Sequence, residues 1–208
     1  ADLTGANLVG ANLAYANVSN VNLSGSILTG INLVGANLDN TDISGSNMVG
    51  AFLAFVNLSG KDLSGTVLIG ANLVNANLSD VDLSGKDLSG TVLIGANLTN
   101  ANLSDVDLSG KKLGETILIG ANLTNANLSD VDFLQWKDLS GTVLTGANLT
   151  NTHLVDADLS GKDLSGTNLS GADLRNADLT GTVLTGANLQ GADLRNAILD
   201  CINHPICN

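Results

Sequence analysis

The sequence predicts an all-β fold in which short extended segments wind as a solenoid around a leucine core. Three observations support this prediction. A five-residue unit recurs forty times along the chain, leucine occupies the centre of thirty-six of these units, and most units end in Gly or Asn. A period of five matches neither an α-helix, which turns once in about 3.6 residues, nor a hairpin meander.

Each position of the unit has an expected role. Side chains of an extended segment alternate between its two sides, so the leucine and the small residue two positions before it point inward. The polar residues on either side of the leucine then point outward. A final Gly or Asn tolerates the positive φ of a tight corner. The central residues other than leucine are Val18, Ile43, Met48 and Phe133.

From Ala1-Asp2-Leu3-Thr4-Gly5 to Ala197-Ile198-Leu199-Asp200-Cys201, the units resemble the A(D/N)LxG consensus of pentapeptide-repeat proteins. This resemblance implies a right-handed quadrilateral parallel β-helix with four units to a coil. Residues 1–200 would then form about ten coils, and stacking at about 4.8 Å would give a rod of roughly 48 Å.

The tail, residues 201–208, contains both cysteines of the chain, Cys201 and Cys207. With His204 as the only other ligand between them, they make a poor zinc site. We therefore expect a disulfide, which would stabilise so short a loop by about 2 kcal/mol. The tail would form a disulfide-closed cap over the unpaired edges of the last coil, and the bond favours an oxidising compartment.

A second repeat, twenty-five residues long, starts at Lys61 and returns at Lys86, Lys111, Lys137 and Lys162, with one extra residue in its third copy. Five units do not fit a four-unit coil, so these inward-position lysines spiral around the rod. We expect each amine to reach water along a corner. The extra residue falls beside Trp136, where a bulged corner would keep Leu113, Phe133 and Leu154 stacked.

Assigning the units in rotation to four faces separates the surfaces. On the first face, the residue after the leucine is always Ser or Thr, whereas on the third face it is mostly apolar. The fold does not demand this contrast, so we predict that the third face contacts a partner, with two arginines as its polar rim. The predicted partner face comprises Tyr15, Val34, Phe52, Phe55, Val74, Val92, Ile94, Leu134, Trp136, Val155, Arg175 and Arg195.

Catalysis is not expected. The chain has two histidines, His153 and His204, and no phosphate-binding, nucleophile or metal-ligand motif. We predict no catalytic residue, no cofactor and no metal. The column Asp42, Asp62 and Asp82 is a weak calcium candidate, because carboxylates alone on a flat face bind poorly.

The sequence therefore predicts a non-enzymatic structural or interaction protein that contacts a protein partner or a second copy. The net charge of −12 disfavours direct nucleic-acid binding, and no apolar run could span a membrane. The resemblance also implies an alternative, an acidic rod that mimics DNA and binds a type II topoisomerase (gyrase). Leucine-centred members of the family from cyanobacteria and the thylakoid lumen are similar, which favours the thylakoid lumen or periplasm, with the cytoplasm as the alternative location.

Overall fold

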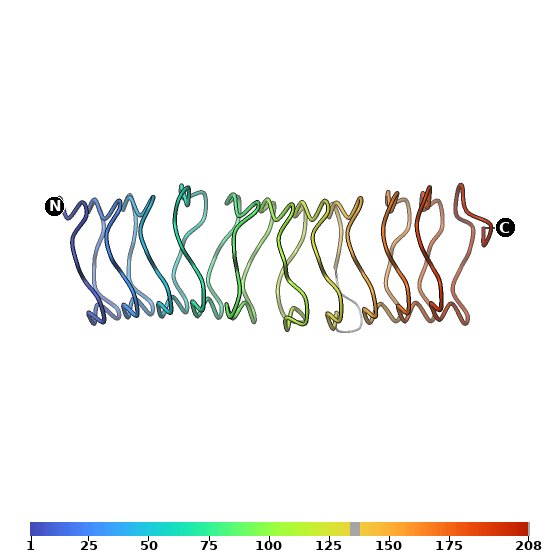
Figure 1. Cartoon of the computed structure of the whole chain (residues 1–208), viewed down its shortest axis with the longest axis horizontal. Coiled ribbons are helices and arrows are strands. Elements are labelled where there is room, and N and C mark those ends of the chain that lie inside the picture. The colour runs from blue at the N-terminus through green and yellow to red at the C-terminus, as the bar shows by residue number, and fades with distance from the viewer. Residues whose placement is uncertain (134–137, 208) are drawn as a thin grey trace.

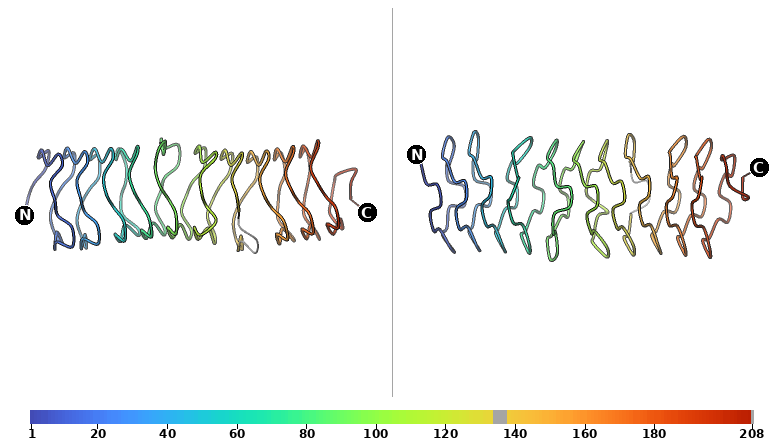
Figure 2. Two further views of the ribbon diagram at one scale, coloured as in Figure 1. Left: turned by 90° about the horizontal axis from the view of Figure 1, so that it is seen from below. Right: turned by 45° about the horizontal axis from the view of Figure 1, so that its top comes forward.

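The computed structural model describes residues 1–133 and 138–207, and the chain forms a rod with its two termini at opposite ends (Figure 1). The same rod is seen in both further views (Figure 2). Parallel β-bridges join residues twenty apart, as in Asp2 to Asn22 and Asn22 to Asp42. Four units therefore complete one coil. The first four coils are residues 1–20, 21–40, 41–60 and 61–80, and each coil presents its four faces in chain order.

The expected short strands are single bridging residues. Across residues 1–133 and 138–207 there is no helix and no strand longer than one bridge, and none of these residues forms a helix that could span a bilayer. Each unit devotes two residues to a turn, in which the leucine carbonyl accepts a hydrogen bond from the amide three residues later, as from Ala6 to Leu3 (2.9 Å). Only the residue before the leucine forms a β-bridge to the next coil, although the leucine amide and the last turn amide also donate hydrogen bonds to that coil, as from Leu3 to Asn22 (2.8 Å) and from Gly5 to Ser24 (3.0 Å).

The polar residue before the leucine also supports the turn. The Asp42 Oδ1 atom accepts hydrogen bonds from the Ser44 amide (2.9 Å) and the Ser44 hydroxyl (2.7 Å). Asn residues accept the same backbone bond, as at Asn72 from Val74 (3.1 Å). The last turn residue has positive φ, which a type II turn requires at its third position. The abundance of Asn, Asp and Gly thus follows from the turn chemistry.

The core is the stack of central leucines, with alanine at the inward small position. From Leu23 to Leu184 these central side chains are buried. Where threonine takes the small position it is buried as well, and its hydroxyl donates to a backbone carbonyl, as from Thr66 to Ile43 (3.1 Å). Burying a hydroxyl is costly without such a bond, so this contact explains how threonine replaces alanine.

The expectation that the inward-position lysines reach water is wrong for those that the structure describes. Lys61 Nζ donates to the Thr41 carbonyl (3.0 Å), and Lys86 Nζ donates to the Thr66 carbonyl (3.3 Å). The Lys162 ammonium bonds to the Leu139 carbonyl (2.6 Å). The ammonium turns inward because carbonyls of the coil below lie within its reach and accept its protons.

The extra residue leaves the register intact on both sides of it. Asp132 bridges to Lys112 below and to His153 above, which is twenty-one residues away instead of twenty. Phe133 and Leu154 are both buried in the core. The predicted stacking of this column is therefore confirmed. Trp136 and the inserted corner lie outside the described residues.

The tail contains the expected Cys201–Cys207 disulfide, with Cα atoms 4.9 Å apart. Ile202 bridges to Val183 and continues the first face beyond the last coil. Leu184 beneath this segment is fully buried, but the last leucines of the other faces, Leu189, Leu194 and Leu199, are only partly buried. The cap therefore covers the end of the rod incompletely.

Candidate interaction surface

The third face comprises residues 11–15 and their equivalents in each later coil. Its bridging column is continuous from Lys112 through Asp132 and His153 to Asp173 and Asp193. This column of the third face is thus in register on both sides of the inserted residue. The column of residues after the leucine lies at the first position of each turn, where neighbouring coils cover part of every side chain. Val34, Val74, Ile94 and Val155 are accordingly half-buried.

The most exposed apolar members of the predicted partner face are aromatic. The exposed fraction is 79% for Tyr15, 62% for Phe55 and 49% for Phe52, and Val92 is also exposed. Arg175 and Arg195 are exposed at the far end of the same face. Leu134 and Trp136 fall outside the described residues, so the structure does not place them.

Tyr15 and Phe55 have an unusual backbone. Fifteen described non-glycine residues have positive φ, and thirteen of them are Asn or Asp. The other two are Tyr15 (58°) and Phe55 (62°), which occupy the same corner of the third face two coils apart. For a bulky residue this conformation is a genuine outlier, whereas Gly or Asn would adopt it with less strain. The Tyr15 ring lies over Gly35, where an added Cβ atom would come within 2.7 Å of it.

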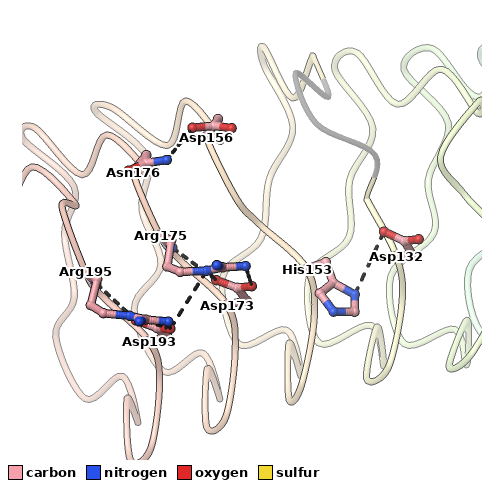
Figure 3. A network of polar contacts seen from close by, with 8 residues as sticks. All are labelled: Asp132, His153, Asp156, Asp173, Arg175, Asn176, Asp193 and Arg195. Carbon is pink, nitrogen blue, oxygen red and sulfur yellow. Dashed lines mark hydrogen bonds and ion pairs between the residues drawn. The ribbon is translucent and has the colours of Figure 1, made fainter.

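The C-terminal part of the face is an ion-pair network (Figure 3). The Arg175 guanidinium donates from Nε (2.7 Å) and Nη2 (2.6 Å) to Asp173, and it lies 3.8 Å from Asp193. Arg195 binds Asp193 in the same forked manner. Hydrogen bonds from Arg175 lower the pKa of Asp173, and those from Arg195 lower the pKa of Asp193. The arginines are thus held by carboxylates of their own face.

His153 lies between Asp132 and Asp173 in the bridging column of the third face, and its side chain is paired with Asp132. Its Nδ1 atom is 3.9 Å from Asp132 Oδ1, and both side chains are exposed. In the described part of the chain no group of three or more His, Cys, Asp or Glu side chains could hold a metal ion. The aspartates of the weak calcium column are engaged in their own turns, because Ser44, Ser64 and Ser84 donate to them.

An opening of about 700 Å³ lies beside Lys61 and extends from the second to the fourth coil. It is lined by Asp39, Asp42 and Asp62 together with the lysine. Hydrogen bonds from Ser44 and Ser64 lower the pKa of Asp42 and Asp62, so both are poor general bases near neutral pH. The opening therefore offers a polar recess without the features of a catalytic site.

The sequence matches the family model for pentapeptide repeats over residues 1–30, 16–53, 46–85, 71–110, 112–135, 137–161 and 163–200. The chain belongs to the pentapeptide repeat family. A similar solved structure is HetL, a pentapeptide repeat protein involved in heterocyst differentiation regulation in the cyanobacterium Nostoc sp. strain PCC 7120. It is 31% identical, the match covers 97% of this chain and 84% of HetL, and the TM-score is 0.57.

Two further structures are more distant. QnrB1, a plasmid-mediated fluoroquinolone resistance protein, is 20% identical over 91% of this chain and 84% of its own, with a TM-score of 0.34. A pentapeptide repeat protein from the Arabidopsis thaliana thylakoid lumen is 29% identical over 53% of this chain and 66% of its own, with a TM-score of 0.29. No curated protein matches the sequence.

In this pentapeptide repeat protein, sequence reasoning missed a part of the exposed apolar surface that lies on the second face. Val9, Ile27 and Val67 are exposed there, beside the third face. The absence of charged residues from this part of the sequence could have revealed them. Residues 6–15, 26–35, 46–55 and 66–75, which form the second and third faces of the first four coils, contain no Asp, Glu, Lys or Arg.

Proposed function

We propose that this protein is a non-enzymatic interaction rod whose third face contacts a protein partner. The observation that carries the proposal is the pair Tyr15 and Phe55, which hold exposed aromatic rings at a corner where Gly or Asn would be less strained. Strain retained at an exposed position points to a role outside the fold. Exposed aromatic side chains are the residues that most often anchor protein interfaces.

The test is a double variant, Tyr15→Asn with Phe55→Asn, which removes both rings and keeps residues suited to positive φ. We expect it to keep its fold and to lose a partner that the parent chain captures from cells of the source organism. Val143→Asn is the matched control, because it removes an exposed apolar side chain from the first face. If the double variant captures the same proteins as the parent chain, the proposal is wrong.

The acidic charge supports a second candidate, binding to a type II topoisomerase (gyrase). Sixteen of the twenty acidic residues follow Ser79, so negative charge is concentrated in the later coils. An acidic rod of this kind would compete with DNA for the topoisomerase. The electrostatic attraction between the rod and the enzyme would weaken as the salt concentration rises. Inhibition of gyrase supercoiling by the purified chain tests this candidate, and absence of inhibition at a large molar excess over gyrase would exclude it.

The disulfide supports an oxidising location, for which the thylakoid lumen and the periplasm are the proposed compartments. Disulfides rarely persist in the cytosol, because its thiol systems keep cysteines reduced. Localisation of the native protein by cell fractionation would test the proposal, and a cytosolic protein with two free thiols would contradict it.

A further inference from the structure

We infer that the partner binds around the edge between the second and third faces of the first four coils, and that its contact surface is uncharged, apolar and concave. This inference rests on the proposed function, because it takes the third face as a partner surface. It adds the second face, restricts the contact to residues 6–75, and specifies the chemistry of the partner.

The charge distribution restricts the contact to this part of the rod. In the first 79 residues the charged side chains are Asp2, Asp39, Asp42, Lys61 and Asp62, and all of them lie on the first or fourth face. From Lys86 onward, charged side chains occur on the second and third faces as well. Ions that lose water without gaining partners oppose association, so the uncharged coils are the part of these faces that an apolar surface can cover.

Exposed apolar side chains lie on both faces of this region. The second face contributes Val9, Ile27 and Val67, and the third face contributes Tyr15, Phe52 and Phe55. The two faces meet at the corner formed by Val9 and its equivalents one, two and three coils above, which are Thr29, Val49 and Ile69. A surface of apolar side chains, interspersed with uncharged Asn and Thr, therefore continues around this edge of the rod.

The available area requires both faces. Four coils of one face measure at most about 16 Å by 19 Å, or roughly 300 Å². A standard protein interface covers about 800 Å² of each partner. Two adjacent faces offer roughly 600 Å², which comes close to that value. A partner that contacts only one face would bury too little of the uncharged surface.

This geometry disfavours a second copy as the occupant. A straight rod with flat faces can lie against one face of another rod, but it has no concave surface to fit around an edge. Two chains that each carry a net charge of −12 also repel one another over their later coils. A different protein with a neutral, apolar cleft matches both the shape and the charge.

The experiment places the photo-reactive residue p-benzoylphenylalanine, in separate full-length chains, at Val67 on the second face, Tyr15 on the third face, and Ser64 on the first face of the same coil as Val67. The chains are irradiated in cells of the source organism. We expect Val67 and Tyr15 to give an adduct with the same protein, and Ser64 to give none.

Binding of that purified protein is then measured. We expect Val67→Asp to weaken binding at least tenfold, with Val9→Asp as a second variant on the same face. Val143→Asp is the matched control, because Val143 has the same place in its unit and is 43% exposed, against 36% for Val67. It should change the dissociation constant by less than about twofold. Raising the salt from about 0.1 M to 0.5 M should not weaken binding.

The outcomes separate the two proposals. An adduct from Tyr15 without one from Val67 overturns the inference and leaves the proposed function standing. No adduct from either position overturns both. An adduct of two copies of this chain, or binding that salt weakens tenfold or more, overturns the stated shape or chemistry of the partner.

Discussion

Lys61 Nζ takes the place of a backbone donor, because it lies 3.0 Å from the Thr41 carbonyl oxygen. In a regular unit that carbonyl accepts the amide twenty-one residues later, as Ala1 accepts Asn22 (2.9 Å). The Asp62 amide makes no such bond to Thr41, and no β-bridge joins Asp42 to Asp62. The lysine thus separates two coils locally and partly repairs the gap with its own ammonium.

We expect Lys61→Ala to raise the free energy of unfolding by about 1 kcal/mol. Alanine is the usual residue at the inward position, and its small side chain would let the Asp62 amide pair with Thr41. Urea unfolding measures the effect. Lys112→Ala is the control, because Lys112 points outward and is exposed, and it should change the free energy by less than about 0.5 kcal/mol. A less stable Lys61→Ala chain would show that the ammonium holds the coils together.

The inward-position lysines predict that stability depends on pH in the alkaline range. Burial lowers the pKa of Lys61, Lys111 and Lys162 from the ordinary 10.5, and nearby aspartates oppose this shift. Between the lowered pKa and 10.5 the unfolded chain binds more protons than the folded chain, so their contribution to stability rises with pH. Urea unfolding from about pH 8 to 10.5 should show a smaller rise in the free energy of unfolding for the triple variant with alanine at these positions than for the parent chain. Equal pH dependence in the two chains would contradict the prediction.

Hydrogen exchange should be faster where the ladder is interrupted. The Leu53 amide donates to the Asn72 carbonyl (2.8 Å), whereas the Ile43 amide has no equivalent bond to Asp62. Both side chains are buried central residues in the same coil. We therefore expect the Ile43 amide to exchange faster than the Leu53 amide, as measured by NMR. In Lys61→Ala the difference should shrink. Equal protection of the two amides in the parent chain would mean that the coils do not open where the ladder is interrupted.

The strained corner predicts that two opposite substitutions, from Phe to Asn and from Asn to Phe, have opposite effects on stability. Phe55→Asn should stabilise the rod by about 1 kcal/mol, because Asn tolerates positive φ better than Phe. Asn75→Phe, at the same corner one coil above and with φ of 54°, should destabilise it by a similar amount. Thermal unfolding of both variants measures the pair. If Phe55→Asn lowers stability, packing of the ring stabilises the rod by more than the backbone strain destabilises it.

The tail predicts a response to reduction. Opening the Cys201–Cys207 bond should destabilise the cap by about 2 kcal/mol and expose the first-face edge that Ile202 now pairs. We expect a lower melting temperature with reductant and concentration-dependent association by light scattering. Cys201→Ser should behave without reductant as the parent does with it. Identical melting of the oxidised and reduced parent chains would show that the disulfide is not needed for the cap.

The order of the residues was enough to determine the repeating architecture. A period of five, a central leucine and a final Gly or Asn specify an inward column and a turn within each unit. These are local relationships that every unit repeats. The pairing of Cys201 with Cys207 was predictable for a similar reason, because six positions of separation and the absence of other thiols leave one partner for each.

The tertiary structure decided what depends on contacts between coils. Lys61 and Thr41 are twenty residues apart, and only stacking brings a carbonyl to the ammonium that was expected in water. Stacking also covers half of Val74 and leaves Phe55 exposed, although both were assigned to one surface from their positions in the unit. The uncharged edge joins residues from four coils. Exposure and charge there are properties of neighbouring coils together, whereas the periodic pattern describes one unit at a time.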